Sequence, residues 1–384
     1  MVDFSGEIRG AFFSLLVHST IMISIHLAGT LVLSWILKCA ATPIAESDRA
    51  IFITRSREQL DPCLKAAYFG SYGGHIQDHI FLPRTDCLAL TSLPGSIAPL
   101  LSNADAGHRI LWIGQAGVDP RIQAVEPVLE SWNLIQTQVD RHGSAQHPLS
   151  VRPAIQLLHH TPHSLLIRVS DTVLPIIDTL LPSHLVPVAL PLTPAAWDPV
   201  PKHLAEKLAK ITKNLTFSPE MDKILADGLI LDDVRRNVRW LTGEGPSGIE
   251  SRHSFTAGAK DAAKWIKGGG PIRVSADNIA KVEATGAQCT LQHFLDGFSP
   301  NVICQYPSLH NSTDQVILSA HYDSRGSFGQ TRAPGGDDDG SGTGHLLAIA
   351  EAIASQKIEF EGNATLAFFA GEEQGLLGSH AYAG

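Results

Sequence analysis

The sequence has little positive charge and no basic cluster. Its 384 residues include 29 Lys and Arg against 38 Asp and Glu, so the net charge is −9 with His neutral. A protein whose main partner is nucleic acid needs a basic face, so we expect no nucleic-acid partner. Charged residues make up 17% of the chain and hydrophobic residues 44%, which excludes a disordered protein and is typical of a globular one.

The chain also lacks a visible internal repeat, and its length is sufficient for two domains. Its N-terminal segment stands apart, because the run from Ala11 to Leu37 is apolar for long enough to span a bilayer. Small residues at Cys39 and Ala41 follow it, as a signal-peptidase site requires. We therefore expect residues 1–41 to be a signal peptide and the protein to be secreted. A membrane anchor through residues 11–37 is the alternative.

Cysteine is scarce, with five residues in the whole chain. Because Cys39 lies in the targeting segment, four cysteines remain, and an even number in an oxidising compartment suggests two disulfides. Three connectivities are possible, and proximity in sequence favours Cys63–Cys87 and Cys289–Cys304. Three glycosylation motifs support secretion jointly, and they begin at Asn214, Asn311 and Asn363.

Residues 42–200 show no catalytic pattern, and we interpret them as a propeptide-like or accessory α/β region. Short apolar runs at 109–114 and 164–169 predict buried strands. The histidines of this region are too few in any one place to hold a metal, including the group His159, His160 and His163. A cluster of prolines at 192–201 marks a domain boundary before residues 201–384.

Helical spacing of apolar residues predicts helices over 202–215, 232–244 and 254–270. Further along, apolar runs at 315–320 and 363–370 predict two strands, and a helix capped by Ser341 and running to about Gln356 lies between them. Strand, helix and strand in this order form a βαβ unit with a parallel pair. Functional sites in such sheets form beyond the carboxyl ends of the strands.

Three consecutive carboxylates stand in the glycine-rich stretch "APGGDDDGSG", residues 333–342, and they repel one another. His321 and the pair Glu372 and Glu373 follow the two predicted strands, so the sheet brings them to the same edge. Imidazole and carboxylate ligands suit zinc, manganese or cobalt, and such a cation would offset the repulsion. An EF-hand calcium loop is excluded, because position 12 counted from Asp337 is Ala348 rather than Glu.

Four motifs in order carry a family resemblance: "HYD" (321–323), "APGGDDDGSG" (333–342), "FAGEEQGLLGS" (369–379) and "AYA" (381–383). With them, residues 230–384 resemble the M28 family of zinc-dependent exopeptidases, the co-catalytic aminopeptidases. The stretches "SRHSF", "NVIC" and "ILSAHYDS" are similar to secreted fungal members. The resemblance implies an α/β fold of three α-β-α layers around a mixed, largely parallel sheet.

The resemblance also implies a role for each matching residue. His321 would bind one zinc ion, with Asp323 orienting its ring. Asp338 would bridge two zinc ions, Glu373 would be a further ligand, and Glu372 would act as the general base. The substrates implied are peptides or proteins with free N-termini. The flanking carboxylates, Asp337 and Asp339, are expected to serve as turn and cap residues.

The family uses two further ligands, an Asp and a His, well downstream of the paired glutamates. The sequence given ends at Gly384, eleven residues after Glu373, and we do not expect His345 or His380 to replace them. We therefore expect an incomplete peptidase domain. Two alternatives are a non-catalytic binding protein or receptor ectodomain with this fold, and a glutaminyl-cyclase-like enzyme with a single zinc ion. The intact Glu372 argues against the first and the complete triple Asp against the second.

Overall fold

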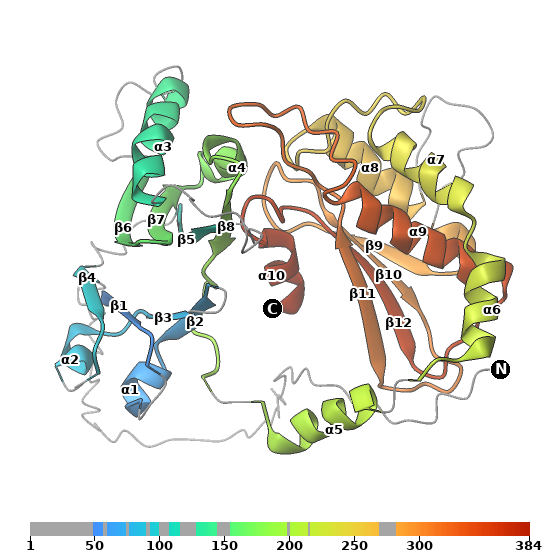
Figure 1. Ribbon diagram of the computed structural model, residues 1–384, viewed down its shortest axis with the longest axis horizontal. Helices are drawn as coiled ribbons and strands as arrows, with labels where there is room; N and C mark the ends of the chain where they lie inside the picture. Colours follow the sequence, from blue (N-terminus) through green and yellow to red (C-terminus); the bar gives the residue numbers. More distant parts are fainter. Residues whose placement is uncertain are drawn as a thin grey trace, which may run out of the picture.

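The computed structural model of the chain (Figure 1) describes residues 49–56, 60–73, 77–89, 93–99, 107–115, 128–143, 154–197, 200–213, 216–268 and 282–384. These residues form three four-stranded sheets together with the helices that pack on them. The chain is therefore of the α/β type, as predicted from its sequence.

The first sheet has the order β2-β3-β1-β4, and all its neighbouring strands are antiparallel. Its strands are β1 (Ala50–Thr54), β2 (Tyr68–Tyr72), β3 (Asp78–Phe81) and β4 (Ser96–Pro99). Two short helices accompany it, α1 (Pro62–Lys65) and α2 (Thr85–Leu88). A disulfide between Cys63 and Cys87 joins these helices, which confirms the predicted pairing.

The second sheet has the order β6-β7-β5-β8 and is also antiparallel throughout. Its strands are β5 (His108–Gln115), β6 (Ile155–Thr161), β7 (Ser164–Ser170) and β8 (Leu185–Ala189), and its helices are α3 (Val128–Gly143), η2 (Leu174–Ile176) and α4 (Ile177–Leu180). The strands predicted at 109–114 and 164–169 are confirmed as β5 and β7. Both strands contribute fully buried aliphatic side chains to one hydrophobic core, which they share with α3. These side chains include Leu111, Ile113, Leu165 and Ile167.

The third sheet has the order β11-β12-β10-β9 and holds the region that resembles a peptidase. Its strands are β9 (Gln288–Gln292), β10 (Asn301–Tyr306), β11 (Gln315–His321) and β12 (Asn363–Phe369). The parallel pair β11–β12 is confirmed, with His321 opposite Phe369. The prediction of a largely parallel sheet is wrong for these four strands, because β12–β10 and β10–β9 are antiparallel. The connection from β9 to β10 is too short for the crossover that parallel strands need.

The helices after residue 200 are α5 (Lys202–Lys213), α6 (Pro219–Gly228), α7 (Leu231–Leu241), α8 (Ala257–Lys267), α9 (Gly340–Ser355) and α10 (Leu377–Ala383), with the 3₁₀ turn η3 (Glu283–Thr285). The helices predicted at 202–215, 232–244 and 254–270 are confirmed as α5, α7 and α8. Helix α6 was not predicted, although its N-cap Ser218 and first-turn Pro219 are ordinary start signals.

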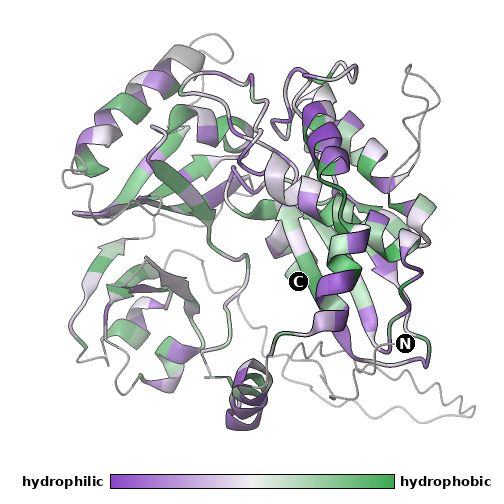
Figure 2. Cartoon of the chain, turned by 45° about the vertical axis from the view of Figure 1, so that its right-hand side comes forward, coloured by the Kyte–Doolittle hydropathy of each residue, from purple (hydrophilic) through white to green (hydrophobic). Residues whose placement is uncertain are grey.

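The core of this part lies between the third sheet and the helices beside it. α8 packs against β9 and β10, and α9 packs against β11. Trp240 of α7 and Trp265 of α8 stack with ring centroids 4.0 Å apart. Figure 2 shows hydrophobic residues along these strands and residues of both kinds along the helices. A second disulfide, Cys289–Cys304, joins β9 to β10 as predicted.

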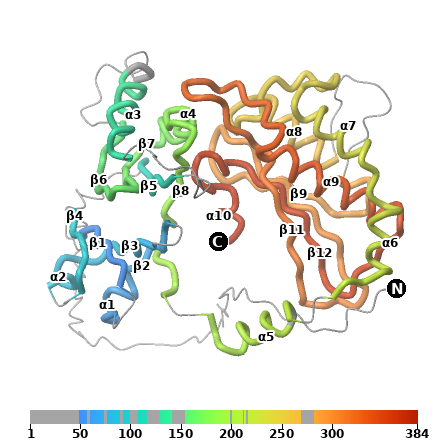
Figure 3. The backbone as a smooth tube through the Cα atoms, in the orientation of Figure 1, coloured from blue at the N-terminus to red at the C-terminus, as the bar shows by residue number. Residues whose placement is uncertain are grey.

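The chain reaches the two parallel strands in a single crossover, from β11 through α9 to β12, as the tube in Figure 3 follows. β11 lies at the edge of the described sheet, and its apolar side chains Val316, Ile317 and Leu318 are exposed. An exposed apolar edge is able to pair with a further strand.

The N-terminal segment for which a signal peptide or an anchor is predicted, residues 1–41, lies outside the described residues. Within the part of the chain that the structure describes, no helix has the length and apolar character needed to cross a bilayer.

Candidate metal centre

The carboxyl ends of β11 and β12 lie side by side and build the site from two directions. His321 is the last residue of β11, and the amide of the following Tyr322 donates to the Phe369 carbonyl at 2.9 Å. The chain leaves β12 through Gly371, which adopts a positive φ of 67° and turns the next two residues toward His321. The two glutamates predicted to be functional follow at once.

Three side chains converge in this corner, as the predicted ligand set requires. His321 Nε2 lies 3.0 Å from Asp338 Oδ1. His321, Asp338 and Glu373 each offer a ligand atom, and these atoms lie within 4.8 Å of one another. Asp338 is exposed and Glu373 is buried, so the group is open to solvent on one side. Glu372 stands beside it, with Oε2 at 3.9 Å from His321 Nε2.

The three aspartates of the glycine-rich loop have different surroundings. Asp339 is the N-cap of α9, and its carboxylate accepts from Gly342 N at 2.7 Å and from His321 N at 3.3 Å. Asp337 forms the turn, since its carbonyl accepts from Ser341 Oγ at 2.7 Å. The prediction of Ser341 as the cap is therefore wrong, because Asp339 already satisfies the first amides of the helix. The carboxylate that faces His321 belongs to Asp338.

Asp323 is fully buried behind His321 and connects it to the glutamate turn. Its Oδ1 lies 3.5 Å from His321 Nδ1. Its Oδ2 accepts from Ser254 Oγ at 2.8 Å, and Ser254 Oγ in turn accepts from Gly371 N at 2.8 Å. The Glu372 amide donates to Asp323 Oδ1 at 3.4 Å. The Asp323 carbonyl also accepts from His321 Nδ1 at 3.2 Å, so this one residue sets the position of both the histidine and the turn.

Arg252, which was not predicted as a functional residue, connects the segments around the site by hydrogen bonds. This fully buried side chain donates to the carbonyls of Tyr322 at 2.8 Å, Leu241 at 3.0 Å and Gly335 at 2.7 Å, and also to the Pro334 carbonyl. Burial lowers the pKa of Arg252 to about 10, with the charges of Asp323 and Asp339 opposing that fall. The sequence gives little indication of this role, because "SRHSF" is a polar stretch of the kind that often precedes a helix.

Electrostatics in the corner is dominated by carboxylates. Burial disfavours a charged His321, but hydrogen bonds to Asp323 and Asp338 outweigh it and raise its pKa to about 11. Burial, together with the charges of Asp323 and Glu372, raises the pKa of Glu373 to about 9. Burial also raises the pKa of Glu372. The hydrogen bond to His321 lowers the pKa of Asp338. The His321 proton thus offsets part of the negative charge.

The residues present fit a divalent cation. Glu373 Oε1 is buried and has no hydrogen-bond partner among the described residues, although a buried carboxylate oxygen requires one. A cation at this point would satisfy that oxygen and take the place of the His321 proton. One imidazole and two carboxylates are a ligand chemistry that zinc accepts.

His345 and His380 lie outside this group of possible ligands, and neither is predicted to replace the two downstream ligands of the family. His345 sits on α9, where its Nδ1 lies 2.7 Å from the Ser341 carbonyl. His380 lies on α10, and burial lowers its pKa. The described group of possible ligands contains neither of them.

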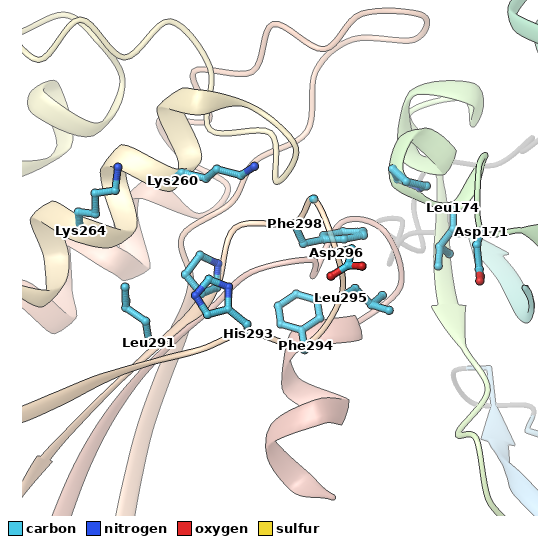
Figure 4. Close-up of a pocket in the computed structure, with 13 residues that line it drawn as sticks. Asp171, Leu174, Lys260, Lys264, Leu291, His293, Phe294, Leu295, Asp296 and Phe298 are labelled. Atoms are coloured by element: carbon cyan, nitrogen blue, oxygen red, sulfur yellow. The ribbon is translucent and has the colours of Figure 1, made fainter. Parts of the chain in front are cut away.

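A cavity of about 1030 Å³ lies between α8, the loop that follows β9 and the residues just after β7 (Figure 4). Its lining includes Lys260, His293, Phe294 and Asp296, and none of the residues of the metal group. The ring of Phe294 packs close to Gly371, so the cavity and the site are separated by the turn itself. None of the residues that line the cavity is a member of the metal group.

Residues 301–384 match the model of Peptidase family M28, which confirms the resemblance seen in the sequence. The chain is 32% identical over 164 residues to leucine aminopeptidase 1 of Aspergillus niger, covering 41% of this chain and 39% of that protein. It is 41% identical over 87 residues to leucine aminopeptidase 1 of Fusarium vanettenii, covering 21% and 22%. The chain thus spans about two fifths of the length of the first of these curated relatives.

Among solved structures, the Legionella pneumophila LapA aminopeptidase aligns with a TM-score of 0.39 and 16% identity. The alignment covers 71% of this chain and 63% of that one.

Replacing Arg252 with Lys should destabilise the protein strongly. A single ammonium group cannot reach all four carbonyls, and each buried carbonyl left unpaired costs about 1–3 kcal/mol. We expect the free energy of unfolding, measured by urea denaturation, to fall by about 3 kcal/mol or more. Arg235→Lys on the exposed face of α7 is the matched control and should change it by less than about 0.5 kcal/mol. Equal effects of the two variants would contradict the role given to Arg252.

The metal-free protein should lose stability as the pH rises from about 5 to about 9. The pKa of Glu373 is raised from 4.5 to about 9, so the folded state binds more protons than the unfolded state between these values. The stabilising contribution is complete below the unfolded pKa and is lost as the pH approaches the folded pKa. Denaturation in the presence of a chelator should show a shallower pH dependence for Glu373→Gln. Glu220→Gln, at an exposed position, should follow the wild type, and an unchanged slope in Glu373→Gln would refute the prediction.

Proposed function

We propose that this chain, whose residues 301–384 belong to Peptidase family M28, is part of a zinc-dependent aminopeptidase that removes residues from the N-termini of peptides. The observation that carries the proposal is the convergence of His321, Asp338 and Glu373, with Glu372 next to them. All four lie in the segment that matches the family model, and two relatives of this chain are named leucine aminopeptidase 1.

Glu372 is proposed as the general base. Its side chain is about one third exposed, so water and substrate can reach it. Burial raises its pKa, which brings the carboxylate closer to the proton affinity that a base needs near neutral pH. In this role a Glu372 oxygen accepts a proton from the water that attacks the scissile carbonyl. The same oxygen then donates the proton to the leaving amine.

His321, Asp338 and Glu373 are proposed as metal ligands, with Asp338 shared between two ions. When bound, the ions supply Lewis-acid chemistry, because they polarise the scissile carbonyl and acidify the attacking water. Asp338 suits a shared position, since it is the exposed member of the group. The Asp323 carbonyl accepts from His321 Nδ1, with the Asp323 carboxylate beside it, and this leaves Nε2 directed at Asp338. The exposed negative charge would attract the ammonium group of a peptide N-terminus.

We further propose that the protein acts outside the cell. The disulfides Cys63–Cys87 and Cys289–Cys304 suit an oxidising compartment. Asn311 is exposed at a positive-φ turn, as a glycan acceptor must be, whereas the Asn363 amide is engaged by the carbonyls of Ser312 and Asp314. The exposed apolar edge of β11 supports a larger sheet, within the three-layer domain that the family resemblance implies.

Glu372→Gln should abolish most of the peptidase activity without loss of zinc. A general base contributes about 10²–10⁴ in rate, so we expect kcat for leucyl-4-nitroanilide to fall by about that factor. The assay uses the full chain, with the zinc content measured in parallel. Glu359→Gln, an exposed change on the same chain, is the control and should retain kcat.

N-acetylated leucyl-4-nitroanilide tests the exopeptidase part of the proposal. Without a free ammonium group this substrate should be cleaved poorly by the wild type. Wild-type rates in Glu372→Gln, or equal rates on the two substrates, would contradict the proposed function.

A further inference from the structure

The second sheet and the glutamate turn share one continuous interface, centred on residues 177–189, which we call the docking segment. It comprises α4, β8 and the residues between them. Figure 1 shows α4 and β8 on the side of the second sheet that faces α10, and Figure 3 shows the same arrangement. Leu180 and Leu181 of this segment pack in one hydrophobic cluster with Phe298 and Leu377. The cluster therefore crosses the boundary that the prolines at 192–201 suggest.

Hydrogen bonds from the Arg325 guanidinium and from the Ala189 amide attach the docking segment to the loops around the metal group. Arg325 lies two residues after Asp323 and donates to the carbonyls of Leu185 at 2.7 Å, Leu181 at 2.6 Å and Pro182 at 3.1 Å. The Ala189 amide donates to the Gly375 carbonyl at 3.0 Å. Both sides of the metal group, the Asp loop and the glutamate turn, are thus attached to this segment.

A buried polar chain passes from the docking segment to the residue next to Glu373. Asp178 Oδ1 lies 3.1 Å from His253 Nε2, and both side chains are fully buried. His253 Nε2 also lies 3.4 Å from the amide nitrogen of Gln374, which is fully buried. His253 Nδ1 accepts from Phe255 N at 3.5 Å, so the ring proton is on Nε2 and is donated to Asp178.

The Gln374 amide completes this chain when its orientation is assigned by hydrogen bonding. Two nitrogen donors cannot bond to each other, and Gln374 Oε1 is buried with no partner among the described residues. Exchanging the amide oxygen and nitrogen places Oε1 at 3.4 Å from His253 Nε2, so that the single N–H of the ring is shared between Asp178 Oδ1 and Gln374 Oε1. A fully buried carboxyl group then holds an imidazole, and the imidazole holds the side chain that follows Glu373.

We propose that Asp178 is a positioning residue for the metal centre, and that the docking segment is a permanent part of the catalytic unit. It acts on Glu372 and Glu373 through His253 and Gln374, much as outer hydrogen bonds orient metal ligands elsewhere. The positioning role of Asp178 rests on the proposed function, because it assumes a metal centre. The attachment of the docking segment to the rest of the chain does not depend on that function. Of the two interpretations of residues 42–200, a propeptide-like region and an accessory region, it favours the accessory one.

Cobalt binding to the full chain tests the role of Asp178. Asp178→Ala removes the acceptor, and we expect the affinity for Co²⁺ to fall about tenfold, with a changed visible absorption spectrum of the bound ion. Asp178→Asn keeps an acceptor oxygen and should recover most of the affinity and the wild-type spectrum. Asp171→Ala, at an exposed position of the same region, is the matched control and should match the wild type. Wild-type affinity and spectrum in Asp178→Ala would overturn the proposal.

Hydrogen exchange separates a failure of this inference from a failure of the proposed function. If the wild-type chain binds no Co²⁺, the metal assignment fails, and the amides of residues 371–378 are compared instead. Faster exchange there in Asp178→Ala than in Asp171→Ala supports the positioning role. Equal exchange overturns it.

A nick in the chain tests the permanence of the docking segment without any core substitution. A protease recognition sequence is inserted beside Val200, which is exposed, and the purified protein is cleaved under native conditions. The two fragments should elute together in size-exclusion chromatography and keep the Co²⁺ affinity of the uncut protein. Fragments that separate, with the metal affinity retained by the C-terminal one, would overturn the proposal even if Asp178→Ala failed to fold.

Discussion

The buried guanidinium of Arg252 is the interaction on which the rest of the site depends. It joins the end of α7, the end of β11 and the glycine-rich loop by donating to Leu241, Tyr322 and the adjacent carbonyls of Pro334 and Gly335. Leu241 is the last residue of α7, whereas Tyr322, Pro334 and Gly335 lie outside helices and strands. A planar fork of donors satisfies several carbonyls at once, which a lysine cannot do. Arg252 therefore connects the strand end that carries His321 to the loop that carries Asp338.

Around that anchor the structure gathers more negative than positive charge. Asp323, Asp338, Glu372 and Glu373 surround a single histidine, and burial raises the pKa of both glutamates. Without a metal, the raised pKa of His321 shows that a proton takes the compensating position. A divalent cation is a stronger compensation, and it would also satisfy the buried Glu373 oxygen that has no partner in the described part of the chain. The three consecutive aspartates are consistent with this reading, because Asp339 caps a helix, Asp337 forms the turn and Asp338 faces the histidine.

The sequence predicted those features that short-range patterns control. The apolar runs that became β11 and β12, the helix between them and the disulfide Cys289–Cys304 are all local, and the turn residues placed His321 and the glutamates at strand ends. Arg252 and Ser254 could not be found this way, because all their side-chain partners except Leu241 lie roughly 70 residues or more away, and a polar run before a helix resembles a solvated cap. Asp178 was missed for the same reason, since its partner His253 lies 75 residues further along the chain. The two antiparallel pairings of the third sheet depend on the directions of β9 and β10. These strands lie outside the βαβ unit of β11, α9 and β12, so its pattern does not predict their pairing.

The measurement that tests the account most directly is a calorimetric titration of Zn²⁺ into the metal-free chain and into Glu373→Gln. The account predicts that the wild type binds zinc and that loss of the Glu373 carboxylate weakens the affinity at least about tenfold, because a ligand and its charge are removed together. Glu359→Gln should bind as the wild type does. A wild-type chain that takes up no zinc, or a Glu373→Gln variant that binds it equally well, would contradict the assignment of this corner of the sheet as a metal centre.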